Sequence, residues 1–479
     1  MPCRLFWRQV FSVLEEVDRM KEKQVMEENP LGTQPIGKLL RGFAIPSCIS
    51  LIVNALYNII DQIFIGRGVG YLGNGATNVI LPFTILAIAI SVLFGDGCAA
   101  FFSMQLGKGE KEQAARGVGN AVFCSVIAGI ILCVVCSIFL HPLCRLTGAT
   151  DTLMPYSLEY GRVIMLGLPF CVFECGMGSI IRADGSPKYS MVGLLAGCGT
   201  NIVLDYLFVF PLHMGVAGAA IATVCGQVVN AVIFVLYFFR FRSVKLRRVH
   251  WKLNPSYIGK ICKLGISSFV TQISVVAIII ITNRLLVYYG ASSKYGAEIP
   301  LTALGVTMKI NNILVSIMVG IAAGALPIIG YNYGAMKYER VKKAVQLSIG
   351  SAMLCGFIAT ICFQVFPEQI VSIFGTSSDL YMEFGVKCLR LFLMFCILDG
   401  MNNVVPTVFQ AVGRPGASAA SSLLRQIGFN VPPALICPLF VGVTGVLWNG
   451  PIACAAAFIL NVILLKRVFH NLKKEMHYV

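Results

Sequence analysis

Charged residues are scarce in this chain, and their scarcity excludes an ordinary soluble protein. Only 13% of the 479 residues are Asp, Glu, Lys or Arg, whereas soluble domains carry about 25%. Hydrophobic residues make up 57% of the chain, and the mean hydropathy is +0.79. These values predict an all-α integral membrane protein with many spans.

Motifs of enzymes are also lacking. The sequence has no Walker loop, no G-x-S-x-G and no His-based metal motif. Its eighteen cysteines lie mostly singly in apolar segments, and its five histidines are scattered. No C-x-x-C pairs with a second C-x-x-C or with a His pair. We therefore expect no enzyme, no cofactor and no metal site, with the cysteines acting as small buried hydrophobes.

A secretory signal is missing as well. The first 25 residues carry several charges and no uninterrupted apolar region. They form either an amphipathic surface helix or an extension ahead of a natural start at Met26. Because they contain no spanning segment, we expect them to be dispensable for membrane insertion and activity.

Long apolar runs dominate the rest of the chain. Twelve of them reach the length that a helix needs to cross a bilayer, at about 1.5 Å per residue. They lie near residues 39–64, 78–105, 118–141, 157–181, 189–212, 215–239, 264–290, 300–330, 345–366, 385–411, 417–440 and 445–465.

The positive charges sort to one side of these spans. The net charge is +16, and placing both termini in the cytoplasm leaves only Arg67, Arg145 and Lys294 in the short outer loops. The residues that this orientation places inside are Lys108, Lys111, Arg116, Arg182, Lys188, Lys337, Arg340, Lys342, Lys343, Arg414 and the basic run from Arg240 to Lys263. Excess Lys and Arg in cytoplasmic loops is the rule for membrane proteins, so we expect contact with anionic lipid rather than nucleic acid.

Two halves of the chain repeat each other. Gln105-Leu-Gly107 matches Asn332-Tyr-Gly334, and Ala183-Asp-Gly185-Ser-Pro187 matches Ala411-Val-Gly413-Arg-Pro415. An even number of spans per half makes the repeats parallel, related by an axis along the membrane normal. The expected organisation has a cytoplasmic tail (1–35), an N-lobe (36–240), a basic inter-lobe loop (241–263), a C-lobe (264–466) and a second tail (467–479). Two such bundles form the layout of a transporter that works by alternating access.

Two acids stand out within the spans of the N-lobe. Asp61 is the only acid of its segment, and Tyr57 lies one helical turn before it. Asp205 follows Asn201 by one turn and lies roughly 10 Å from the outer end of its segment. An ionisable group at such depth costs at least ~2.5 kcal/mol unless it faces a wet cavity or a partner. Asp61 is therefore either a helix-end aspartate that reaches the headgroups or, as we expect, a functional carboxylate.

Several of these stretches together resemble one transporter family. Ala44-Ile-Pro46, Asp61-Gln-Ile-Phe-Ile-Gly66, the Arg182–Gly185 turn and the Asn201/Asp205 pair are similar to the multidrug and toxic compound extrusion (MATE) family, in its DinF-like and MepA-like branch. The resemblance covers about residues 30–470. It implies a secondary antiporter of the bacterial cytoplasmic membrane that expels organic, mostly cationic compounds against protons or sodium.

The resemblance also implies a pocket in the first lobe. Its lining residues correspond here to Tyr57, Asp61, Tyr160, Asn201, Asp205 and Thr223. A carboxyl group in such a low-dielectric pocket can exchange a proton near neutral pH. For each Tyr, Asn or Thr taken alone, helix–helix hydrogen bonding is the competing interpretation.

The second lobe offers Lys309 and Asp399 as further candidates. They form either a structural ion pair or part of a substrate site. Asp399 resembles a second-lobe acid of the NorM-like branch, but the partner glutamate of that branch has no counterpart in Phe269–Val275. This absence favours proton over sodium coupling in the first lobe.

Two alternatives remain beside a monomeric efflux antiporter, namely a flippase for lipids or lipid-linked oligosaccharides and a membrane receptor without transport.

Overall fold

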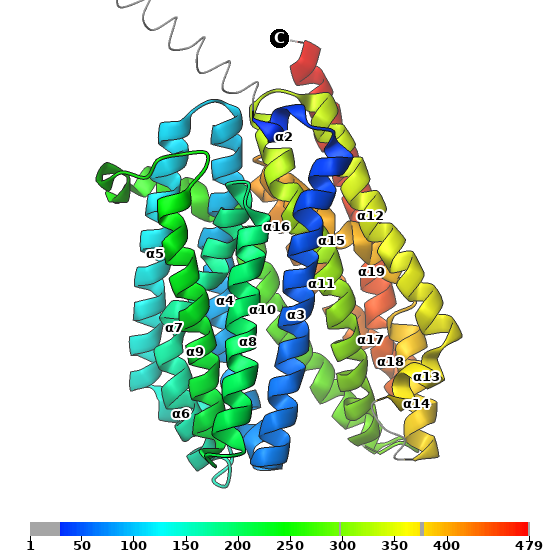
Figure 1. The fold of residues 1–479 in the computed structure, drawn as a ribbon. Coiled ribbons are helices and arrows are strands. Elements are labelled where there is room, and N and C mark those ends of the chain that lie inside the picture. Colours follow the sequence, from blue (N-terminus) through cyan, green and yellow to red (C-terminus); the bar gives the residue numbers. More distant parts are fainter. Residues whose placement is uncertain (1–28, 297, 374–377, 478–479) are drawn as a thin grey trace, which may run out of the picture.

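The computed structural model describes residues 29–296, 298–373 and 378–477, and this part of the chain consists of helices joined by short turns (Figure 1). The expectations for residues 1–25 lie outside the described residues. The first half contains α2 (Pro30–Thr33), α3 (Ile36–Gly68), α4 (Tyr71–Gly107), α5 (Lys111–Ile138), α6 (Leu140–Leu146), α7 (Met154–Ala183), α8 (Pro187–Val209), α9 (Gly215–Leu236) and η1 (Tyr237–Arg240). The second half contains η2 (Arg248–Trp251), α10 (Pro255–Ala291), α11 (Glu298–Gly334), α12 (Tyr338–Val365), α13 (Pro367–Ser372), α14 (Asp379–Phe392), α15 (Cys396–Ala411), α16 (Pro415–Leu423), the π-helical turn η3 (Leu424–Gly428), α17 (Val431–Val441), α18 (Val443–Leu447) and α19 (Asn449–His477).

Within the described residues, eleven helices are long and apolar enough to cross a membrane. Their outward faces carry large apolar side chains, as on α5, where Ile131 and Ile138 are 57% and 69% exposed. Such faces are stable against lipid and unfavourable in water. The predicted all-α membrane fold is confirmed.

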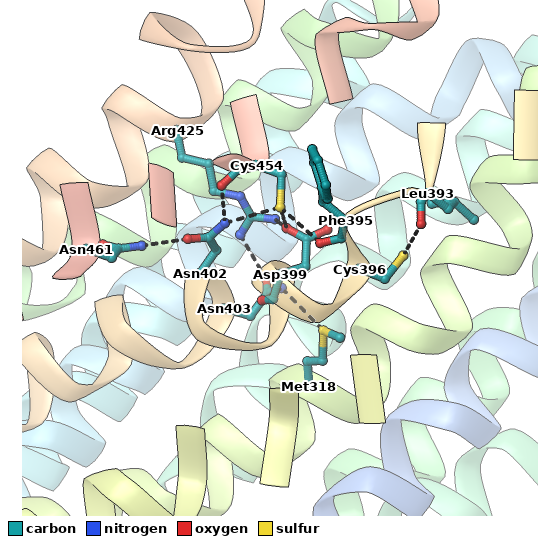
Figure 2. Close-up of polar contacts among 10 residues, drawn as sticks. All are labelled: Met318, Leu393, Phe395, Cys396, Asp399, Asn402, Asn403, Arg425, Cys454 and Asn461. Atoms are coloured by element: carbon teal, nitrogen blue, oxygen red, sulfur yellow. Dashed lines mark hydrogen bonds and ion pairs between the residues drawn. The ribbon is translucent and has the colours of Figure 1, made fainter. Parts of the chain in front are cut away.

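One predicted span is not a single helix. The segment 385–411 is divided into α14 and α15 by a break at Leu393–Phe395. Thiol groups engage two backbone carbonyls there: Cys396 Sγ donates to Leu393 O at 3.1 Å, and Cys454 Sγ of α19 donates to Phe395 O at 3.3 Å (Figure 2). A side chain that takes such a carbonyl interrupts the helical ladder, and neither Pro nor Gly marks this point in the sequence.

The predicted inter-lobe loop is shorter than 241–263, because α10 begins at Pro255. Asn254 is its N-cap, since the Asn254 side chain accepts a hydrogen bond from Ser256 N at 2.9 Å. Asn followed by Pro is a helix-start signal. The start of the segment is hydrogen-bonded to the N-lobe. The Asp184 carboxylate accepts from the backbone N–H groups of Arg242 and Ser243 at 2.8 and 3.0 Å, and also from Oη of Tyr237, just before the segment, at 2.7 Å.

The described part of the predicted N-terminal tail is docked rather than loose. Asn332 Nδ2 donates to Leu31 O at 3.0 Å, and Arg340 Nη2 donates to Gln34 O at 2.6 Å. Residues 29–35 therefore lie against the turn between α11 and α12. They share one end of the bundle with the C-terminal end of α19 (Figure 1), as an even number of crossings requires.

The two halves exchange contacts in a symmetric way. Helix α4 packs against α10 and α11, and α11 packs in turn against α3. Since α3 and α4 of the first half correspond to α10 and α11 of the second, this is the pattern of a twofold axis between the halves. The axis passes near Gly107 and Gly334, where a Cβ on either glycine would lie only 2.1 Å from the carbonyl oxygen of Tyr331 or Met104, respectively.

This close approach predicts that Gly107→Ala lowers the stability of the protein. The added methyl group meets backbone, which has no rotamer to yield, so we expect a loss of about 1–3 kcal/mol. Thermal unfolding of the purified protein in one detergent measures the effect. Gly199→Ala on α8 is the matched control, because nothing lies within 4 Å of its Cβ position; equal melting temperatures for the two variants would contradict the prediction.

Candidate functional site

The six predicted pocket residues all lie in the first half of the chain, on four neighbouring helices. Their positions are Tyr57 and Asp61 on α3, Tyr160 on α7, Asn201 and Asp205 on α8, and Thr223 on α9. Helix α8 packs against α3 and α9, and α7 packs against α9. The one-turn spacing within α3 and within α8 turns both residues of each pair toward the same neighbour.

The two acids of this group differ in how far they are withdrawn from solvent. Asp205 is fully buried, and Asn201 is 2% exposed, whereas Asp61 and Tyr57 are half-buried. Asn201 Nδ2 donates to Thr223 Oγ1 at 3.3 Å. That bond joins α8 to α9 and leaves Asn201 Oδ1 without a partner.

The two carboxyl groups lie close enough to interact with each other. Both Asp205 oxygens and Asp61 Oδ1 are buried and have no hydrogen-bond donor in the described structure. Two ionised carboxylates are both acceptors, so neither can satisfy the other. One proton, or one small cation, placed between them would satisfy both, and this is the chemistry that the arrangement offers.

A cavity between the halves lies at the C-terminal end of α3 and the N-terminal end of α4. It has a volume of about 410 Å³ and is lined by Ile59, Gln62, Ile63, Gly66, Arg67, Asn74 and Lys309. The glycine contact at Gly107 and Gly334 lies at the opposite ends of α4 and α11. The halves are thus closely packed at the end that holds the described termini and hollowed toward the other end.

Of the two alternatives for Lys309 and Asp399, the ion pair between them does not form. Asp399 Oδ1 accepts from Arg425 Nη2 at 2.9 Å, and both side chains are 20% exposed (Figure 2). Lys309 is exposed and lines the cavity between the halves; no ion pair of Lys309 occurs in the described part of the chain. The reason is geometric: Asp399 lies in the first turn of α15, and the π-helical turn η3 brings Arg425 opposite to it.

A polar network surrounds this ion pair. Arg425 Nη1 donates to Asn403 Oδ1 at 3.2 Å, and Asp399 Oδ1, 3.4 Å from Cys454 Sγ, competes with Phe395 O for the single thiol hydrogen of Cys454. Behind them, Asn461 Nδ2 donates to Asn402 Oδ1 at 3.0 Å. The sequence marks Asp399 and Arg425 as membrane-embedded charges, but their pairing depends on a helix break and a π turn that carry no clear sequence signal.

We expect that either Asp399→Asn or Arg425→Gln lowers the thermal stability, because each leaves an uncompensated charge or donor inside the membrane domain. The partial exposure limits the loss to about 1–3 kcal/mol. The double variant should lose less than the sum of the two single losses, as for residues in contact. Lys309→Gln is the control and should leave the melting temperature unchanged; additive single losses would count against the pair.

Sequence comparison finds a family model and relatives that cover most of the chain. The sequence model of the MatE family matches residues 46–207 and 268–436, more than half of the chain. The chain is 27% identical over 438 residues to the multidrug export protein MepA of Staphylococcus aureus (strain MSSA476), covering 90% of this chain and 94% of that protein.

Solved structures show the same fold. A crystal structure of MATE in complex with MaL6 superposes with a TM-score of 0.87 at 23% identity, over 93% of this chain and 99% of that one. An outward-facing conformation of a multidrug resistance MATE family transporter of the MOP superfamily also gives a TM-score of 0.87 at 23% identity, over 93% and 98% of the two chains. At this identity, the likeness concerns the arrangement of helices.

Proposed function

Because the chain belongs to the MatE family of multidrug and toxic compound extrusion transporters, we propose that it is a secondary antiporter. It exports organic, mostly cationic compounds across the bacterial cytoplasmic membrane in exchange for protons, with both termini in the cytoplasm. The observation that carries the proposal is the pair of Asp61 and Asp205, three of whose four carboxylate oxygens are buried without a hydrogen-bond donor. Proton coupling at this pair is the simplest use of such a group.

Binding of proton and drug would be linked through one charge. Two carboxylates this close resist joint ionisation, so one of them holds a proton. A cation that enters from the cytoplasm favours the ionised form. Protonation from the outside then neutralises the pocket and lowers its affinity for the cation, and this linkage is reciprocal.

The arrangement of the lobes fits one step of such a cycle. With the termini in the cytoplasm, the close contact at Gly107 and Gly334 closes the inner side, and the cavity near Lys309 opens outward. Rocking of the lobes about the α3–α11 and α4–α10 contacts would expose the pocket inward. In the C-lobe, Arg425 already neutralises Asp399, which supports coupling in the N-lobe.

Asp61→Asn should abolish gradient-driven efflux, with a loss of at least about tenfold, because the side chain can no longer gain or lose a proton. Efflux of a fluorescent cation is measured from cells expressing the full chain, with and without an ionophore that collapses the proton gradient. Asp205→Asn should behave alike. Asp151→Asn, at an exposed acid paired with Arg145, is the matched control and should export normally.

Binding provides an independent measurement. Addition of the drug to purified wild-type protein in weak buffer should release protons, and Asp61→Asn should lose that release while keeping some drug binding. Efflux by Asp61→Asn at the wild-type rate and with an unchanged pH dependence would place the coupling site elsewhere, with Asp399 as the first candidate.

A flippase for anionic, lipid-linked substrates is the second candidate, favoured by the two basic residues of the cavity, Arg67 and Lys309. The two functions predict opposite results for Lys309→Gln. A cation exporter should keep or increase its efflux, since a repelling charge is removed. A flippase should lose activity by about tenfold in a vesicle assay with a fluorescent lipid-linked phosphate, because the cation that binds the phosphate is gone.

A further inference from the structure

Three side chains with metal-binding atoms converge on one turn of α7. Cys171, Glu174 and Cys175 stand at positions i, i+3 and i+4, so they share a helical face. The two sulfur atoms and a carboxylate oxygen all lie within 4.8 Å of one another. Two thiolates bound to one Zn²⁺ are about 3.8 Å apart at Zn–S distances of about 2.3 Å, so small side-chain rotations would bring the three atoms to a common ion.

The cluster borders the acidic pocket of the N-lobe. Cys171 is buried, whereas Glu174 and Cys175 are half-buried. Tyr57 of α3 interacts electrostatically with both Glu174 and Asp61, so it lies near the cluster and near the carboxyl pair. Cys198 of α8 interacts with Glu174 as well. The face of α7 that carries the three side chains is thus turned toward α3 and α8 rather than toward lipid.

The surroundings can support a cation and its ligands. Asn230 Oδ1 is buried without a hydrogen-bond partner and lies beside the Glu174 carboxylate. Arg182, which interacts with Cys175, is held by Ser179, because Arg182 Nη2 donates to Ser179 Oγ at 2.8 Å. With two thiolates and one carboxylate, a divalent ion leaves a net charge of −1, and the guanidinium of Arg182, which also faces Asp96, partly offsets it.

We propose that Cys171, Glu174 and Cys175 bind a thiophilic divalent cation of the Zn²⁺ class. Thiolate sulfur selects soft or borderline ions such as Zn²⁺ and Cd²⁺ over Mg²⁺ and Ca²⁺, which prefer oxygen ligands. Binding forms two metal–sulfur bonds and one metal–oxygen bond, and the two thiol protons pass to water. Three protein ligands would leave the fourth position of a tetrahedral ion open. The site is independent of drug export, so its test does not depend on the proposed function.

Titration of the purified full chain with Cd²⁺ tests this site, followed by the ultraviolet charge-transfer absorbance of cadmium thiolates. We expect one tight equivalent, displaced by Zn²⁺ and not by Mg²⁺. The double variant Cys171→Ser/Cys175→Ser should lose it. Cys133→Ser/Cys136→Ser on α5 is the matched control, because that pair has the C-x-x-C spacing but belongs to no converging ligand group in the described part of the chain; it should keep the tight equivalent.

Glu174→Gln distinguishes a site with three ligands from binding by the two thiols alone. This variant keeps both sulfur atoms, so the absorbance per bound Cd²⁺ should persist while the affinity falls by about tenfold or more. Its result also does not depend on whether the double serine variant folds. The folding of that variant is checked by comparing its size-exclusion elution profile with that of the wild type. Equal Cd²⁺ binding by both double variants, or an unchanged affinity in Glu174→Gln, would overturn the proposal.

Discussion

The constraint on which this structure depends is that a polar group inside a bilayer must find its partner within the protein. Asp399 meets that requirement through Arg425, and Asn402 meets it through Asn461. The Asp61 and Asp205 pair does not meet it: three of their oxygens are buried without donors. These three buried acceptor oxygens on two interacting acids are the observation on which our proposal of an exchangeable ion rests.

The same constraint shapes the two lobes differently. The N-lobe helices are continuous, and its acids lie on regular turns of α3 and α8. Two helices of the C-lobe are interrupted. At Leu393–Phe395 the Cys454 thiol donates to a backbone carbonyl, and at η3 the Arg425 guanidinium donates to the Asp399 carboxylate. Breaks and π turns concentrate at functional positions. Here they hold the ion pair of Asp399 and Arg425. The two lobes thus share a fold, but among the described residues the buried carboxylate oxygens without a hydrogen-bond partner lie in the N-lobe.

The closest contact between the lobes is made by glycines, which have no side chain to hold the two backbones apart. Backbones approach most closely where Gly107 and Gly334 cross, and without Cβ atoms the helices pack by direct van der Waals contact, which is the main source of helix association in lipid. Such a contact is tight but contains few directional bonds. It suits the interface that our proposed cycle would open and close, with the cavity beside Lys309 as its counterpart at the other end.

The sequence by itself determined the features that follow from local chemistry. Apolar run lengths predicted the membrane fold, the Gly107 and Gly334 motifs predicted the repeat, and the one-turn pairs Tyr57/Asp61 and Asn201/Asp205 predicted which side chains share a face. Tertiary structure decided everything that depends on which faces meet. It joined Asp399 to Arg425 instead of Lys309, divided the segment 385–411, and brought Cys171 and Glu174 of α7 near Tyr57 of α3. The physical reason is that helix periodicity fixes directions within one helix, whereas the rotation of each helix against its neighbours depends on packing along its whole length.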